Sequence, residues 1–438
     1  MGAVLSWGRY PARPQTPHDI TWRNDLPHIW SRVVDGHRST LAFGNGRSYG
    51  DSCLAASGHV LRTRSLDRLI SADWETGVLR AESGITLEQI LEVTIPRGWI
   101  LPVTPGTKYA TLGGAIANDV HGKNHHVRGT FGRHVRRFML ARSDGARLEC
   151  TAETNAAFHA ATIGGLGLTG IIEWAEIELM PIKSSSINVT SIRFGNLDEF
   201  FALSEAYDAL HEYSVAWIDC LGRDDQLGRG IFMVGDHAAE GALEVDRRPK
   251  RTVPFTFPAP IFNKATLRAF NGLYYHRQQA REVHSTVSYD RYFYPLDALL
   301  EWNRIYGRRG FQQYQCVVPR SVARDATRDM LRAIADSGTG SFLAVLKRCG
   351  DIQSPGLLSF PMEGTSLALD FPQRDDKNRR LFAVLDAIVR EAAGRIYPAK
   401  DAHMTGEDFR AAYPDWEQVD TLRDPALLSN FWNRVTRT

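Results

Sequence analysis

Hydrophobic and polar positions form two different patterns along the chain. The first pattern, of short strands and few helices, extends to about residue 180. Thr86 and Gln89 form a capping box ahead of apolar residues at helical spacing, which predicts a helix that ends at Gly98. Short apolar or alternating stretches between turn residues predict strands at 40–43, 77–82, 137–141 and 171–180, with a further strand ending at Cys150.

The second pattern begins after a predicted boundary at 181–186 (PIKSSS) and has longer alternating strands between amphipathic helices. This order predicts an antiparallel sheet with helices on one face. The polar, basic and Pro-rich residues 235–260 are predicted to form a mobile loop or lid. The predicted strands are 188–194, 215–220, 231–234, 311–318, 342–347 and 366–371, and the predicted helices are 197–211, 321–337 and 376–393.

Length and composition narrow the possibilities. A chain of 438 residues with 43% hydrophobic and 23% charged residues is expected to be a two-domain globular enzyme. The net charge of +2 gives no electrostatic reason to expect nucleic-acid binding. Five scattered cysteines without a CxxC pair predict neither a disulfide framework nor a metal site. With no leader and no long apolar run, we expect a cytoplasmic protein or one peripheral at the inner membrane.

Three glycine-rich clusters carry the first chemical signal. They lie at 44–50, 101–135 and 164–170, where the chain must turn sharply or approach a ligand closely. Main-chain N–H groups in such turns can surround a phosphate or lie against a flat ligand. The third cluster matches GxGxxG, but a strand pattern follows it, so a Rossmann site is not indicated. The alternative is a set of glycine-rich turns beside a solvated basic loop.

The order of these motifs resembles the vanillyl-alcohol-oxidase, or PCMH-type, family of FAD-dependent oxidoreductases. The resemblance implies an α+β fold with a two-part FAD-binding domain, 1–183 and 395–438, around a substrate domain at 184–394. The matching phrases are Trp7-Gly8-Arg9, GRSYGD (46–51), LPVTPGTKYATLGGAIANDVHGKNHH (101–126), FGRHV (131–135), LGLTGII (166–172), EWNRIYG (301–307), FQQYQCVVP (311–319), LALDFP (367–372) and YPAKD (397–401).

The resemblance also implies which residues hold the cofactor. Many relatives link the flavin covalently to a histidine, but Arg47 stands at that place here, so non-covalent FAD is expected. The predicted cofactor-binding residues are Gly44, Asn45, Gly46, Arg47, Ser48, Tyr49, Gly50, Pro105, Gly106, Thr107, Thr111, Gly113, Gly114, Ala117, Asn118, His121, Gly122, Asn124, Gly170, Ile171, Tyr397 and Lys400.

Oxidation of an alcohol needs a hydride acceptor, which is the flavin, and a base for the hydroxyl proton. Four titratable residues lie in the segments that the resemblance places round the flavin ring. Tyr49 and Lys400 are the predicted partners of the substrate hydroxyl, and His121 and Lys123 the predicted ring-side or orienting groups. Taken singly, each could equally be an ordinary packing or surface residue.

The resemblance places six further residues in a substrate pocket. Gln313 and Gln315 are two apart on one strand and so share a face, where their amides could bind a sugar, and Lys347 could meet a phosphate. The chain departs from its mycobacterial-type relatives at Ser366 and Ala368, where those have Asn-x-Cys, and at Phe293, where those have Tyr. The reactive pocket cysteine is therefore absent.

The activity that the resemblance implies is oxidation of the 2-hydroxyl of a polyprenyl-phosphoryl pentose, such as decaprenylphosphoryl-β-D-ribose. This is the first half of a 2-epimerisation that a separate short-chain reductase would complete. The sequence leaves both oxygen and a quinone open as the electron acceptor. The basic loop within 235–260 weakly favours a substrate at a membrane surface. The alternatives are an aldonolactone or alditol oxidase and a non-catalytic flavin or sugar-phosphate binding protein.

Overall fold

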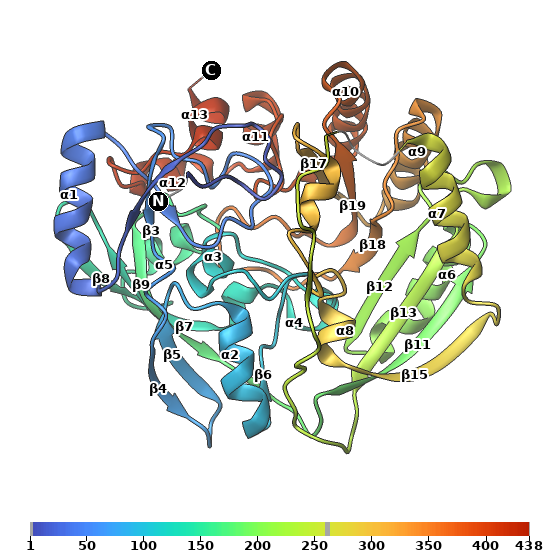
Figure 1. Ribbon diagram of the computed structural model, residues 1–438, viewed down its shortest axis with the longest axis horizontal. Helices are drawn as coiled ribbons and strands as arrows, with labels where there is room; N and C mark the ends of the chain where they lie inside the picture. Colours follow the sequence, from blue (N-terminus) through green and yellow to red (C-terminus); the bar gives the residue numbers. More distant parts are fainter. Residues whose placement is uncertain (1–2, 259–262, 438) are drawn as a thin grey trace.

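The computed structural model describes residues 3–258 and 263–437. It has two halves that lie side by side in Figure 1. The left half holds the N-terminal part of the chain, in blue to green, together with the last helices in red. The right half holds the middle of the chain, in green to orange.

A five-stranded antiparallel sheet forms the centre of the first half. The helix α2 (Leu87–Thr94) and the short helix α3 (Leu112–Ala117) pack their apolar residues against it. The capping box of Thr86 and Gln89 is confirmed, and Gly98 ends the helical stretch with a left-handed φ of 80°. The strand order is β4 (Leu69–Asp73), β5 (Val78–Glu82), β9 (Ile171–Glu178), β7 (Val135–Ala141) and β8 (Arg147–Cys150).

A small parallel sheet lies beside it, in the order β1 (Thr16–Asp19), β3 (His59–Arg62) and β2 (Ala42–Phe43). The helix α1 (Leu26–His37) covers this sheet through Leu26, Trp30 and Val33. The strand predicted at 40–43 is thus shorter than expected, because Thr40 instead pairs with Leu427 near the C-terminus. Strand β2 runs directly into the first glycine cluster.

The second half is an eight-stranded, fully antiparallel sheet, as the second pattern predicts. Four long helices accompany it: α6 (Leu197–Tyr207), α7 (Lys264–His276), α9 (Ala323–Ser337) and α10 (Asp375–Glu391). The strand order is β15 (Glu282–Ser288), β11 (Ser186–Phe194), β13 (Gly230–His237), β12 (Tyr213–Ile218), β18 (Ala344–Cys349), β19 (Gly364–Pro372), β17 (Phe311–Pro319) and β20 (Arg395–Ile396).

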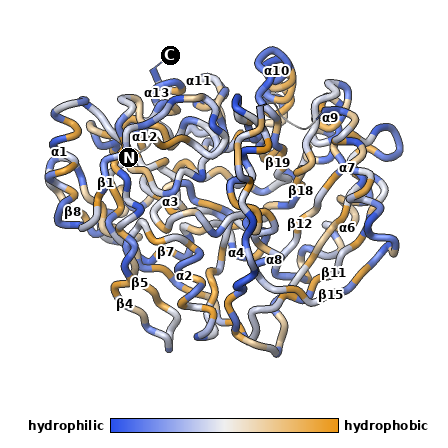
Figure 2. The backbone as a smooth tube through the Cα atoms, viewed as in Figure 1, coloured by the Kyte–Doolittle hydropathy of each residue, from blue (hydrophilic) through white to orange (hydrophobic). Residues whose placement is uncertain are grey.

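The two faces of this sheet differ because side chains alternate along a strand. On β17, Tyr314, Cys316 and Val318 join the core beneath the helices, whereas Gln313 and Gln315 face the first half of the molecule. Figure 2 shows both colours on α10, which turns Leu381, Leu385 and other apolar residues inward and its hydrophilic side outward. The helices therefore cover one face and leave the other for the site.

The C-terminal residues return to the first half. In Figure 1 the red helices α11 (Gly406–Ala412), α12 (Trp416–Leu422) and α13 (Asn430–Thr436) lie over the blue segments. Arg434 forms ion pairs with Asp51, next to the first glycine cluster, and with Asp401. The division at 183 and 394 stays a prediction, and β20 still pairs with β17 of the large sheet.

Several local expectations need correction. The helix predicted at 197–211 ends at Tyr207, and the hydrophobic pattern does not predict α1 or α7. The predicted loop 235–260 begins inside β13 and includes β14 (Arg251–Thr252), while its last two residues lie outside the described part. The remaining elements are η1 (Arg23–Asp25), η2 (Ile95–Arg97), β6 (Trp99–Ile100), α4 (His125–Arg128), η3 (Phe131–His134), α5 (Ala156–Thr162), β10 (Met180–Pro181), η4 (Asp208–Leu210), η5 (Asp224–Gln226), α8 (Tyr289–Phe293), β16 (Leu299–Leu300) and η6 (Trp302–Tyr306).

The length and hydropathy of the helices show whether any of them could span a membrane. Across residues 3–258 and 263–437, no helix is both long enough and apolar enough to span a bilayer.

Candidate active site

A cavity of about 700 Å³ lies between the two halves. Its walls come from the glycine loop after β2, from the 104–123 stretch, from β17, β18 and β19, and from residues 397–400. All the site residues predicted from the sequence border this cavity except Gly50 and Asn124. These wall segments, some of them hundreds of residues apart in the sequence, therefore surround the same cavity.

The loop Gly44–Ser48 offers unused main-chain donors at one end of the cavity. Among the described residues, no protein acceptor pairs with the N–H groups of the four residues 45–48. Gly46 holds a positive φ of 60°, which bends the loop. A Cβ on Gly44 would lie 2.4 Å from Thr111 Oγ1, so only glycine lets this loop lie against the N-terminus of α3. Free donors in a bent loop fit an anionic group.

The second glycine cluster forms a part of the cavity wall in which the backbone packs closely against neighbouring segments. Gly113 lies in α3, where a Cβ would come 2.9 Å from the Cβ of Ser83, and the Thr111 side chain caps this helix by accepting from the Gly114 N–H. The Gly106 position has open space where a Cβ would be. The glycine-rich segment that is predicted to form a turn is therefore a short helix here. Its small residues still leave room for a broad ligand.

Arg47 is a half-buried cation that points at the same space. Its guanidinium stacks over the rings of Trp7 and Tyr109, at 4.2 and 5.1 Å from their centroids. Its Nε is buried and has no hydrogen-bond partner within the described structure. Burial lowers the pKa of this guanidinium, which favours an anionic partner in the cavity. The free amides, the glycine walls and this cation together fit a flat ligand that carries a diphosphate, as FAD does.

Two predicted cofactor residues prove to support the fold. A Cβ on Gly50 would lie 1.6 Å from the carbonyl oxygen of Asp401, so this glycine allows the C-terminal segment to dock. Asn124 donates to the carbonyl of Pro102 at 2.8 Å and to Glu212 at 3.0 Å. Neither residue borders the cavity, and their contact with the cofactor stays a prediction.

Lys400 and Tyr49 lie together, as predicted. Lys400 Nζ is 3.8 Å from the centroid of the Tyr49 ring. No hydrogen-bond acceptor pairs with this ammonium in the described residues, and its side chain faces the cavity. Burial lowers the pKa of Lys400 to about 8, partly opposed by Asp370. Burial also raises the pKa of the Tyr49 hydroxyl well above its ordinary value, so Tyr49 is a proton donor rather than a base.

Asp370 is a buried carboxyl that the predictions do not include. It accepts a hydrogen bond from Gln313 Nε2 at 2.7 Å, and burial raises its pKa to about 7. It stands two residues after Ala368 on β19, so it shares the face of Ala368 that borders the cavity. The same period of two could have identified it from the sequence LALDFP.

His121 lies between a lysine and an amide. Lys347 Nζ contacts His121 Nδ1 and donates to the carbonyl of Gly122 at 2.6 Å. Gln315 Nε2 is 3.1 Å from the other imidazole nitrogen. Burial and the Lys347 charge hold the pKa of His121 well below its ordinary value, so the imidazole is neutral. Burial lowers the pKa of Lys347 to about 8.

Lys123 is the third lysine that borders the cavity. Its Nζ donates to the carbonyl of Tyr292 and lies 4.3 Å from the centroid of that ring. Burial and then Lys347 lower its pKa to about 7. Phe293 borders the cavity beside it and packs on Tyr213 at 4.8 Å between centroids. Three lysines around one cavity make it suited to anionic ligands.

The cavity-facing side of the large sheet combines polar and apolar residues in one row across neighbouring strands. Gln315 pairs with Ala368, Ala368 with Val345, and Val345 with Trp217 across four adjacent strands. All four border the cavity, and so do Ser366, Val215 and Met233. The row therefore changes from polar near Gln315 to apolar near Trp217. The sequence predictions include only its polar end and Ala368.

Comparison with known proteins agrees with this site. Residues 22–151 match the family described as "FAD binding domain". The chain is 36% identical over 442 residues to decaprenylphosphoryl-β-D-ribose oxidase of Mycolicibacterium smegmatis, covering 96% of this chain and 94% of that protein. It is 26% identical over 194 residues to a putative D-arabinono-1,4-lactone oxidase of Neurospora crassa, covering 40% and 34%. It is 22% identical over 209 residues to mouse L-gulonolactone oxidase, covering 46% and 47%.

The resemblance drawn from the motifs is thereby confirmed, as is the enzyme class that it implies. The cavity carries a donor set that fits FAD, and the similarity extends over both halves of the molecule. The chain belongs to the PCMH-type FAD-dependent oxidoreductases that act on CH–OH groups, the family that includes decaprenylphosphoryl-β-D-ribose oxidase.

Proposed function

We propose that this enzyme oxidises the 2-hydroxyl of a polyprenyl-phosphoryl pentose such as decaprenylphosphoryl-β-D-ribose, with FAD bound non-covalently. The row from Gln315 to Trp217 carries the proposal, because one continuous wall offers amides for a sugar and an apolar surface for a lipid chain. A free sugar lactone needs the amides of this wall, but it has no lipid chain to contact the apolar surface. The full-length similarity to the mycobacterial oxidase points to the same substrate class.

The flavin is held by shape and charge in this proposal. The N–H groups of the Gly44–Ser48 loop and the Arg47 guanidinium would hold the diphosphate. Arg47 has no nucleophilic nitrogen at neutral pH, so the place where relatives attach the flavin cannot form that bond. Denaturing the yellow protein with acid should release all of the flavin into the supernatant, and flavin that stays with the protein pellet would contradict this point.

When bound, FAD supplies the hydride acceptor for the alcohol carbon. The protein must take the hydroxyl proton, and Lys400 is the best placed group because its pKa of about 8 leaves a neutral fraction near physiological pH. Tyr49, whose hydroxyl keeps its proton, donates a hydrogen bond that orients the substrate oxygen. Asp370, bonded to Gln313, supplies the negative charge that stabilises Lys400 once it is protonated.

His121 and Lys347 have a positioning role in this scheme. The neutral His121 is fixed between Lys347 and Gln315, so it holds Gln315 in place for a sugar hydroxyl. Lys347 and Lys123 border the same cavity, where a substrate phosphate would favour their protonated forms and would be attracted to them.

The product, a 2-keto sugar on the same lipid carrier, would pass to a separate short-chain reductase that reduces the ketone from the other face. A lipid-linked substrate would also draw the enzyme to a membrane surface, where the exposed Arg247 and Arg251 would contact anionic headgroups. Oxygen and a quinone remain the two acceptors to compare for reoxidation.

Anaerobic reduction of the bound flavin tests the proposal. Decaprenylphosphoryl-β-D-ribose should bleach the visible flavin band, while ribose 5-phosphate and L-gulono-1,4-lactone at equal concentration should not. Trp217→Ala should raise KM for the lipid-linked sugar and leave flavin content unchanged, because Trp217 lies at the apolar end of the row. Equal or faster bleaching by the lactone would favour the aldonolactone-oxidase alternative, and no bleaching by any sugar would favour a binding protein.

A further inference from the structure

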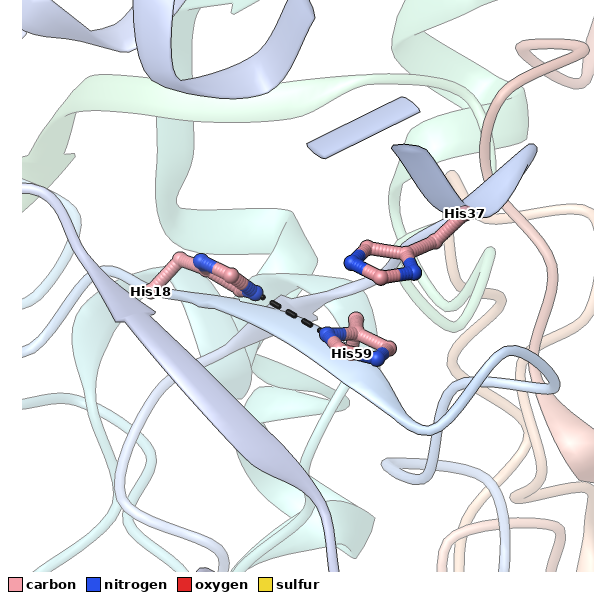
Figure 3. Close-up of side chains that lie close together, drawn as sticks. All are labelled: His18, His37 and His59. Carbon is pink, nitrogen blue, oxygen red and sulfur yellow. Dashed lines mark hydrogen bonds between the residues drawn. The ribbon is translucent and has the colours of Figure 1, made fainter. Parts of the chain in front are cut away.

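Three histidines gather at the small parallel sheet, outside the cavity (Figure 3). His18 comes from β1, His59 from β3 and His37 from the last residue of α1. Figure 3 shows their rings turned toward one another, with His37 lying against His59. They come from three separate elements at positions with no ligand motif, which is why the sequence predicts no metal site.

The spacing of the imidazoles suits a shared ion. One nitrogen of each of the three rings lies within 4.8 Å of the others. His18 Nε2 is 3.1 Å from His59 Nδ1. Two nitrogens bound to one tetrahedral zinc ion at about 2.0–2.1 Å would be about 3.3 Å apart. The His37 and His59 rings are nearly parallel, with centroids 3.4 Å apart, so a small rotation of the exposed His37 completes the set.

The neighbouring side chains leave ring nitrogens of the three histidines available to bind a metal ion. Within the described residues, no carboxylate forms an ion pair with any of the three rings, and the only side-chain hydrogen bond of the cluster joins His18 to His59. Arg32 and Asp19 are the nearby charged groups, and Asp19 is already paired with Arg62.

We propose that His18, His37 and His59 form a binding site for one divalent transition-metal ion of the zinc type. Imidazole is a preferred ligand of Zn²⁺, Cu²⁺ and Ni²⁺, and water can take a fourth position because His37 is exposed. The ion fastens the end of α1 to β1 and β3. Since β3 also pairs with β2, which leads into the Gly44–Ser48 loop, the ion stabilises the support of that loop.

Zinc titration of the chelator-treated, FAD-loaded protein tests this site. Competition with a chromophoric chelator should give one Zn²⁺ per chain, with an affinity that His59→Ala and His37→Ala each weaken at least about tenfold. His28→Ala is the matched control, because His28 is also on α1 but exposed and outside the cluster, and it should leave the affinity unchanged. Electron paramagnetic resonance of the Cu²⁺ form should show nitrogen hyperfine coupling that the two cluster variants reduce.

Thermal unfolding with and without Zn²⁺ gives a second measurement on the same samples. Zinc should raise the midpoint of the wild-type protein and of His28→Ala but not that of His37→Ala, which can fold because its side chain is exposed. Stoichiometric binding that persists unchanged in His37→Ala and His59→Ala would overturn the proposal. So would the absence of any zinc binding or midpoint shift in the wild-type protein.

Discussion

At the scale of single residues, the site depends on burial that shifts proton affinity. Lys400 acts as a base only when neutral, and its pKa is about 8, so kcat/KM should be low below that pH and rise to a plateau above it. Lys400→Met should lower kcat by roughly 10²–10⁴-fold, the usual contribution of a positioned base. Stopped-flow flavin reduction across pH values measures both effects.

Lys400→Arg separates proton transfer from electrostatics. Arginine keeps the positive charge over Tyr49 but does not deprotonate in proteins. If Lys400 takes the proton, this variant should be nearly as slow as Lys400→Met while still binding FAD. A variant with arginine that retains most of the rate and the same pH profile would rule out Lys400 as the base.

Cysteine reactivity is a second prediction at this scale. The resemblance predicts that Ala368 stands where mycobacterial-type relatives have a reactive cysteine, and the cysteine that borders the cavity here is Cys53. Burial, with Asp51 nearby, raises the pKa of Cys53 to about 12, so it has almost no thiolate at neutral pH. Thiol-directed inhibitors should therefore leave no adduct, and Ala368→Cys should restore sensitivity. Intact-protein mass spectra that show an adduct on Cys53 with lost activity would contradict this.

At the scale of elements, the loop after β2 and the turn of α3 fit together only through glycine. Gly44→Ala would place a methyl 2.4 Å from Thr111 Oγ1 and push the Gly44–Ser48 amides away from the diphosphate position. We expect a loss of FAD affinity of at least about tenfold, equivalent to about 1.4 kcal/mol. Gly36→Ala in α1 has open space at its Cβ and is the matched control. Fluorescence titration of apoprotein with FAD gives both affinities.

At the scale of the whole molecule, the C-terminal segment closes the site. Arg434 joins Asp51 beside the glycine loop at 2.9 Å to Asp401 beside Lys400 at 2.8 Å. Arg434→Met would leave the buried Asp51 without its ion pair and Asp401 with His403 as its remaining ion-pair partner, and should cost about 3–5 kcal/mol of unfolding free energy. Chemical denaturation measures the loss, with the exposed Arg437→Met as control. Equal stability of the two variants would show that the C-terminal segment docks by packing alone.

Much of the local structure follows from the sequence because it depends on neighbours along the chain. The capping box at Thr86 and the alternation of β17 are local patterns, and each predicts its element correctly. The glycine clusters predict where the chain bends closely, but not that Gly113 and Gly114 lie in the short helix α3. The motifs also identify the family, and nearly all the site residues that they predict border the cavity. Gly50 and Asn124 are the predicted residues that do not border the cavity, because they pack against Asp401 and Glu212 from distant parts of the chain.

Only the tertiary structure decides what depends on distant contacts. The lowered pKa of Lys400, the buried Asp370 behind Gln313 and the polar-to-apolar row across four strands arise from strand pairing and burial. The histidine cluster likewise exists only where α1, β1 and β3 meet. Residue types and local spacing determine which groups this protein has for its chemistry, whereas packing determines which of them share a cavity and how tightly each holds its proton.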